Sequence, residues 1–146
     1  MLSKRDFVRS NTLGRAKNFW WILDDDCKII VLRQFNMKST KQPHETIISS
    51  DIIQHLIDLL PNDEWFPLAN NVEKLSNGTE VEGIGKILYD QGFNTTDCQT
   101  ASHLGTIFYQ AGIWLYNGKL NGIKFQKNPD VTEWCNHLRK YYTSHF

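Results

Sequence analysis

The sequence of 146 residues carries no net charge, no long apolar run and no closely spaced pair of cysteines. Because a membrane-spanning helix needs about 20 apolar residues in succession, we expect no membrane partner. Residues 1–11 lack the apolar segment of a secretory signal. The three cysteines, Cys27, Cys98 and Cys135, are odd in number and far apart. This pattern favours reduced thiols, a cytoplasmic location and no metal site.

The sequence also lacks any recognisable catalytic constellation. Cys98 precedes His103 by five residues, which is not the spacing at which two side chains meet on one helix. Asp24, Asp25 and Asp26 follow one another directly. They suit a solvated turn better than a cation site, because successive side chains on a tight turn diverge. We therefore expect a non-enzymatic protein with no catalytic residue, no metal and no cofactor.

Charge is segregated along the chain although the total is zero. Residues 1–43 hold nine Lys and Arg against four Asp and Glu, whereas residues 44–95 hold two against nine. Residues 96–146 hold five against three. A neutral total is therefore compatible with an anionic partner, which needs only a local basic face. The alternative is that the basic and acidic stretches neutralise each other within the fold.

Apolar residues make up 40% of the chain and fit a folded globule. We expect an α+β fold, with an N-terminal region 1–48 and a second region 49–146 that together form one compact domain or two. The runs 19–23 and 28–32 are rich in aromatic and β-branched residues and predict a β-hairpin. A polar, basic loop is expected at 34–42, ended by Pro43.

Helical spacing and punctuation residues predict the elements after Pro43. Ser49 or Ser50 would cap a helix that Pro61 ends, and Thr79 with Glu82 has capping-box spacing. The predicted helices cover 50–60, 67–75, 80–91 and 97–110, followed by strands 113–116 and 123–127 and by a helix that opens at 129–130.

The order helix, short turn, helix and hairpin over residues 80–127 resembles a winged helix-turn-helix. "EGIGKILYDQG" is similar to its supporting helix, "TTDCQTASHLGTIFYQAG" to its recognition helix and "IWLYNGKLNGIKFQ" to its wing. The resemblance implies duplex DNA binding by a transcription regulator or by the DNA-recognition subunit of a larger machine. The 97–110 helix would then enter the major groove.

Short polar side chains on the outward side of that helix have the types that contact base edges and phosphates. Basic residues of the wing and of the N-terminal region would add phosphate contacts. The candidate nucleic-acid-binding residues are Gln99, Thr100, Ser102, His103, Thr106, Asn117, Lys119, Asn121, Lys124, Lys127, Arg15, Lys17 and Lys38.

Two further partners follow from the sequence. The acidic stretch 45–90 favours an alternative function, a small intracellular inhibitor or immunity-type module that binds a basic protein. The aromatic residues Trp134, Tyr141 and Tyr142 of the C-terminal helix are candidates for a homodimer face.

Overall fold

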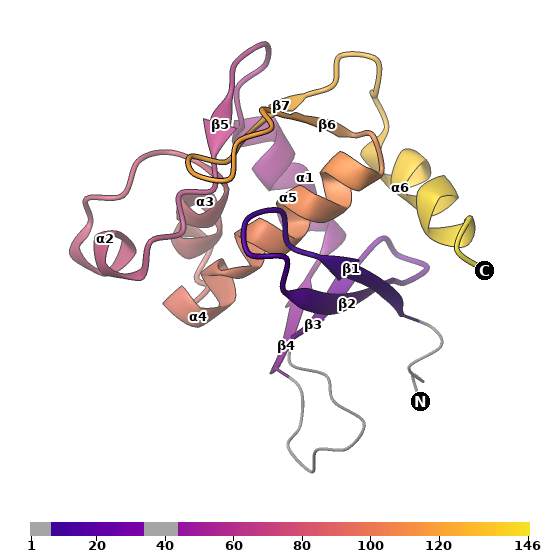
Figure 1. Cartoon of the computed structure of the whole chain (residues 1–146), viewed down its shortest axis with the longest axis horizontal. Coiled ribbons are helices and arrows are strands. Elements are labelled where there is room, and N and C mark those ends of the chain that lie inside the picture. Colours follow the sequence, from indigo (N-terminus) through magenta and orange to yellow (C-terminus); the bar gives the residue numbers. More distant parts are fainter. Residues whose placement is uncertain (1–6, 34–43) are drawn as a thin grey trace.

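The computed structural model describes residues 7–33 and 44–146 and has the expected α+β character. The expected loop at 34–42 and the candidate Lys38 lie outside the described residues. Two antiparallel sheets lie on either side of a central helix, α5, and shorter helices surround them (Figure 1).

The first sheet has four strands in chain order and includes the predicted hairpin. Phe19 pairs with Arg33 and Leu23 with Ile29, so the hairpin prediction is confirmed. The two outer strands, of four and five residues, were not predicted. The strands are β1 (Val8–Asn11), β2 (Asn18–Leu23), β3 (Ile29–Arg33) and β4 (His44–Ile48).

Helix α1 (Ser50–Leu59) confirms the predicted helix and its cap. The Ile52 amide donates a hydrogen bond to the Ser49 hydroxyl oxygen over 3.2 Å. This bond satisfies one of the amides that a helix start leaves free.

The predicted helix 67–75 is wrong in its first half. Phe66–Pro67 forms strand β5, and the helix α2 (Val72–Asn77) begins only after Asn71, whose side chain caps it. Pairing of Phe66 with Phe125 overrides the local helical signal. Gly78 ends α2 in the left-handed region, with φ of 80°.

Helix α3 (Ile84–Asp90) begins later than predicted. The capping box of Thr79 and Glu82 does not form, because Gly83 is the N-cap of α3 and the Thr79 hydroxyl donates to the Asn77 side chain instead. Residues 91–94 then form the predicted short turn.

The predicted helix 97–110 is divided in the structure into α4 (Thr95–Cys98) and α5 (Thr100–Gln110). The Asn94 side chain caps α4 by accepting a hydrogen bond from the Asp97 amide. The predicted hairpin follows as β6 (Trp114–Tyr116) and β7 (Lys124–Lys127). Strand β5 joins it to make a three-stranded sheet in the order β5-β7-β6.

Helix α6 (Trp134–Thr143) covers the end of the four-stranded sheet. Trp134 and Tyr142 are buried within the chain, and both Tyr141 and Tyr142 lie against the Trp21 ring. Their aromatic faces are therefore used inside the protein, so the expected homodimer face is wrong for Trp134 and Tyr142.

Helix α5 fits closely against the three-stranded sheet because residue 105 has no side chain. A Cβ atom on Gly105 would lie 2.4 Å from Cε2 and 2.5 Å from Cζ of Phe125. Phe125 is buried, and its ring is 5.8 Å from both the Trp114 and the Tyr116 rings. The ring has little room to move aside.

Gly105→Ala is expected to lower the free energy of unfolding by about 1–3 kcal/mol through overpacking, although alanine favours a helix over glycine by about 1 kcal/mol. Urea unfolding measures the change. In a Phe125→Leu background the penalty of Gly105→Ala should shrink. A stabilised Gly105→Ala variant would contradict the close packing of α5 on β7.

A disulfide joins Cys27, in the turn after β2, to Cys135 in α6, with 6.0 Å between the Cα atoms. The expectation of three reduced thiols is therefore wrong for these two residues, and only Cys98 is a free cysteine among the described residues. Arg139 reinforces the same junction by donating to the carbonyl oxygens of Leu23 and Asp24. Disulfides are typical of oxidising compartments, so the cytoplasmic expectation loses the support that it took from reduced thiols.

The disulfide spans 108 residues, and a cross-link of that span stabilises by about 4–5 kcal/mol in the chain-entropy model. Cys135→Ser should therefore lower the urea midpoint, and dithiothreitol should have the same effect on the parent chain but none on the variant. Three titratable thiols in the unreduced, denatured parent chain would contradict the cross-link.

Candidate nucleic-acid groove

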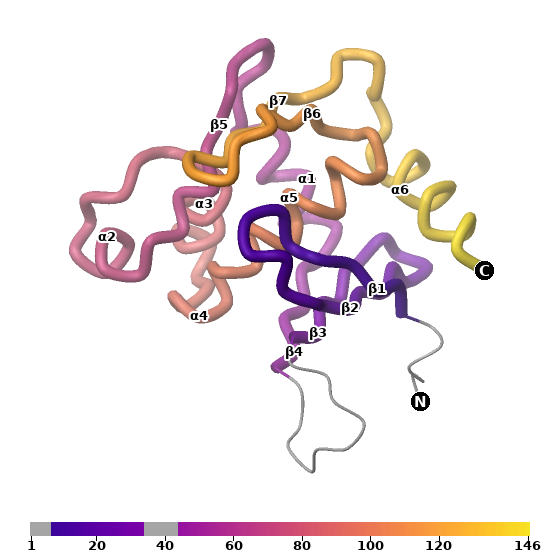
Figure 2. Tube along the Cα trace, in the orientation of Figure 1, coloured from indigo at the N-terminus to yellow at the C-terminus, as the bar shows by residue number. Residues whose placement is uncertain are grey.

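A groove of about 660 Å³ opens where the loops of both sheets meet the start of α5. Its walls are the β1–β2 loop and the β6–β7 loop, which lie side by side in Figure 2. They touch at Gly14, where a Cβ atom would lie 3.2 Å from Cδ1 of Ile123. The residues that line it are Thr12, Gly14, Arg15, Lys17, Asn18, Arg33, Leu68, Gln99, Ser102, His103, Leu120, Asn121 and Ile123.

The β1–β2 loop is held by its own hydrogen bonds. The Lys17 amide donates to the Thr12 hydroxyl over 3.1 Å, and the Thr12 amide donates to the Lys17 carbonyl over 3.0 Å. A third bond joins the Ala16 amide to the Thr12 carbonyl. The backbone thus fixes where Arg15 and Lys17 leave the loop, while both side chains stay exposed.

The β6–β7 loop is also closed by local bonds. Asn117 donates from its side chain to the Gly122 carbonyl over 3.0 Å and accepts from the Lys119 amide over 3.2 Å. The Tyr116 hydroxyl donates to the Lys119 carbonyl over 2.5 Å. These bonds place Leu120 and Asn121 in the groove wall.

Among the residues that the structure describes, the groove lining contains three cationic side chains, Arg15, Lys17 and Arg33, and no carboxylate. Arg33 is anchored by a hydrogen bond of 3.2 Å from Nη2 to the Thr96 carbonyl. Burial lowers the pKa of its guanidinium, and the nearby Asp97 carboxylate opposes that change. The Arg33 Nε atom is buried without a hydrogen-bond partner in the described part of the chain.

Asp97 lies outside the groove lining but acts on Arg33 through its charge. His44 Nε2 lies 2.8 Å from Asp97 Oδ1, and the Thr46 hydroxyl donates to the same oxygen over 3.0 Å. These contacts join β4 to α4. Asp97 offsets part of the positive charge of Arg33, so Arg15 and Lys17 are the exposed cations that an anion in the groove would meet.

His103 lies at the floor of the groove and is 6% exposed. Its ring meets Phe19 edge-on, with 4.7 Å between the ring centroids. Burial and the charge of Arg33 lower the pKa of His103 to about 4, so the imidazole is neutral at pH 7. Its Nδ1 atom, like Arg33 Nε, has almost no accessible surface. A hydrogen bond with the Gln99 backbone opposes the fall of the His103 pKa.

Six of the predicted site residues come together in this groove: Arg15, Lys17, Gln99, Ser102, His103 and Asn121. Gln99 is fixed at its edge, since its side-chain amide donates to the Asn70 carbonyl over 2.7 Å. Arg33, the last residue of β3, also lines the groove but was not predicted as a site residue. The sequence does not show that the end of β3 lies beside the start of α5.

The predicted contact of the 97–110 helix with bases is not available in this structure. Thr100 and Thr106 have no exposed surface, and β1 and β2 lie over the face that was expected to read DNA. The Thr106 hydroxyl donates to the Ser102 carbonyl over 2.9 Å, and Gln110 accepts from the Ser10 hydroxyl over 2.7 Å. The polar face of α5 is therefore an internal contact.

The remaining predicted residues lie outside the groove. Lys119 and Lys124 are exposed on the hairpin. The Asn117 side chain donates a hydrogen bond within the β6–β7 loop. Lys127 donates to the Asn62 side chain over 3.1 Å, next to α1. Burial lowers the Lys127 pKa, which the Asp58 carboxylate opposes.

Cys98 is a buried thiol and not an activated one. Burial, followed by the charges of Asp97 and Asp90, raises its pKa to about 11. Its Sγ atom donates to the Phe93 carbonyl at 3.8 Å. Within the described residues, no group of three His, Cys, Asp or Glu side chains gathers where it could hold a metal ion.

None of the helices in the described ranges is long and apolar enough for a bilayer crossing. Comparison of the chain with protein-family models, with curated proteins and with solved structures finds no match.

His103 makes stability depend on pH. Its pKa is about 4 when folded against 6.5 ordinarily, so the unfolded chain binds more protons between these values. The free energy of unfolding should therefore fall by about 3 kcal/mol from this residue as the pH drops through that window.

Urea unfolding at pH 7 and at about pH 4.5 tests this, because His103→Gln should lose less stability on acidification than the parent chain. His55→Gln, a change at an exposed site on α1, is the matched control. Equal acid sensitivity of His103→Gln and the parent would contradict a buried neutral imidazole.

Proposed function

We propose that this chain binds a single strand of nucleic acid in the groove between the β1–β2 and β6–β7 loops. The observation that carries the proposal is a groove whose lining, among the described residues, has three cations, Arg15, Lys17 and Arg33, and no carboxylate. Phosphate contacts supply most of the affinity in sequence-independent binding of nucleic acids.

The groove offers each part of a nucleotide a suitable surface. Arg15 and Lys17 face the solvent at one wall, where backbone phosphates would lie. Gln99, Ser102 and the neutral His103 at the floor are of the types that hydrogen-bond base edges. Leu68 and Ile123 add apolar surface for a base face. The volume of about 660 Å³ lies in the range of pockets that enclose small organic groups.

A single strand fits this arrangement better than a duplex. Major-groove reading requires an exposed recognition helix, and α5 is covered by β1 and β2. An unpaired base can leave its strand and reach the floor of a groove, whereas a base within a duplex is stacked and paired.

The order α3, turn, α4–α5 and β6–β7 supports a winged-helix scaffold for this function. In that interpretation the four-stranded sheet occupies the surface that a recognition helix otherwise offers to DNA. The hairpin keeps a binding role, because its loop forms one wall of the groove.

Fluorescence anisotropy of a labelled oligonucleotide of about 12 nucleotides, in about 50 to 200 mM salt, tests the proposal. Each phosphate contact adds about 0.7 to the slope of log K against log salt for a single strand, so Arg15→Ala with Lys17→Ala should reduce the slope by about 1.4. Lys140→Ala, a change on the exposed side of α6, should leave the affinity within about twofold.

Three results would contradict the proposal. The first is no binding at the lowest salt, and the second is equal loss in the Lys140→Ala control. The third is tighter binding of the matching duplex than of the single strand, which would favour a surface other than this groove.

A further inference from the structure

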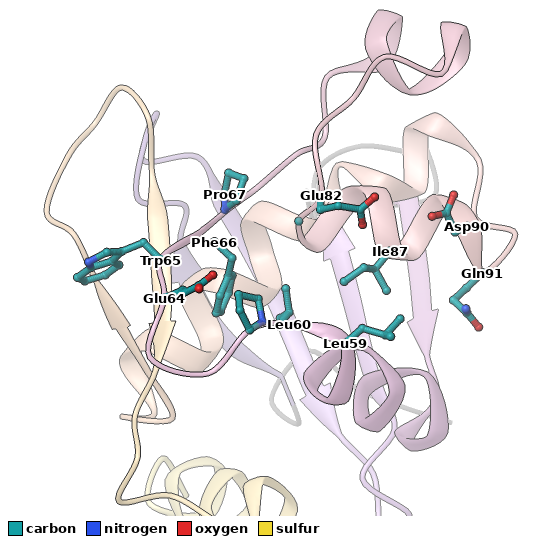
Figure 3. A pocket seen from close by; sticks show the side chains of 12 residues that line it. Leu59, Leu60, Glu64, Trp65, Phe66, Pro67, Glu82, Ile87, Asp90 and Gln91 are labelled. Carbon is teal, nitrogen blue, oxygen red and sulfur yellow. The ribbon is translucent and has the colours of Figure 1, made fainter.

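A second groove, of about 300 Å³, lies between α1, the β5 segment and α3 (Figure 3). It shares no lining residue with the cationic groove. Its floor is apolar and is formed by Leu59, Leu60, Phe66 and Ile87. Leu59 is 56% exposed, whereas the other three are buried. Leu59 therefore supplies most of the apolar surface that the floor offers to a partner.

Carboxylates surround this floor. Glu82 and Asp90 reach it from the α3 side and Glu64 from the β5 side (Figure 3). Lys86 pairs with Asp90, with 2.7 Å between the charged atoms, and also lies near Glu82. Glu64 and Glu82 form no ion pair within the described ranges, so the rim keeps a negative excess.

Exposed apolar residues add to the surface at the margins of the groove. Trp65, one of the lining residues, is 46% exposed, and its indole points away from the floor (Figure 3). Val81, next to Glu82 in the chain, is 58% exposed. An apolar floor with an acidic rim and apolar margins has the composition of a docking surface for another protein.

We propose that this groove binds a cationic amphipathic segment of a protein partner. An apolar side chain of the segment would lie on Leu59 and Ile87, and its Lys or Arg side chains would pair with Glu64 and Glu82. Charge complementarity selects this occupant, because an acidic or neutral segment would leave the carboxylates without partners. This inference does not depend on the proposed nucleic-acid groove.

The probe is a fluorescein-labelled synthetic peptide of about 12 residues, made of leucine and lysine at helical spacing. A second peptide, with glutamate in place of every lysine, controls for hydrophobic binding. The full chain should bind the first peptide, and the acidic peptide should bind at least about tenfold more weakly.

The double variant Glu64→Lys with Glu82→Lys should weaken binding of the cationic peptide by about tenfold or more. Leu59→Ser should weaken it by about fivefold or more through loss of apolar contact. The matched control is Glu73→Lys with Glu133→Lys, which makes the same change of charge at exposed positions on α2 and before α6. It should keep most of the affinity.

Equal loss in both double variants would overturn the inference, because it would indicate attraction to the total charge alone. Absence of peptide binding would also overturn it. Self-association of the parent chain in sedimentation equilibrium, abolished by Glu64→Lys with Glu82→Lys, would assign the groove to a second copy instead. Arg15→Ala with Lys17→Ala should leave peptide binding unchanged, so failure here and failure of the nucleic-acid proposal are distinguishable.

Discussion

Helix α5 packs on two sides at once, with His103 against Phe19 of one sheet and Gly105 against Phe125 of the other. Both contacts are close. The His103 and Phe19 ring centroids are 4.7 Å apart, and a Cβ atom on Gly105 would lie 2.4 Å from the Phe125 ring. The two sheets share one cluster of buried side chains through this helix. Because the interior is densely packed, neither sheet can shift without disturbing the other. Helix α5 is therefore a buried element of the core and is not exposed for contact with bases.

The packing of both sheets on α5 also forms the cationic groove. The four-stranded sheet carries the β1–β2 loop to the start of α5, and the three-stranded sheet carries the β6–β7 loop to the same place. His103 is buried there, and Arg33 is half-buried. The acidic groove between α1, the β5 segment and α3 shares no lining residue with the cationic groove.

Sequence patterns predicted the elements whose signals are local. The β2–β3 hairpin, the Ser49 cap and the β6–β7 hairpin follow from alternation, capping chemistry and an Asn-Gly turn. Long-range pairing accounts for the errors. Phe66–Pro67 becomes a strand by pairing with β7. The polar face of α5 is internal because β1 and β2 cover it, and the Thr106 hydroxyl bonds back to its own helix. Short polar side chains can be buried in this way at little cost, so their position on one face did not establish exposure. The α+β class and six groove residues were predictable, whereas Arg33 in the groove and the Cys27–Cys135 cross-link were not.

The central claim is that ligand binding uses the loops at the start of α5 while the helix stays covered. Amide hydrogen exchange of the full chain, with and without a single-stranded oligonucleotide, tests it most directly, because exchange reports local opening at each segment. We predict slower exchange in the β1–β2 and β6–β7 loops and unchanged, slow exchange along α5. Faster exchange in β1 and β2 on binding, with protection transferred to α5, would contradict the claim, because the sheet would then open and the helix itself would meet the nucleic acid.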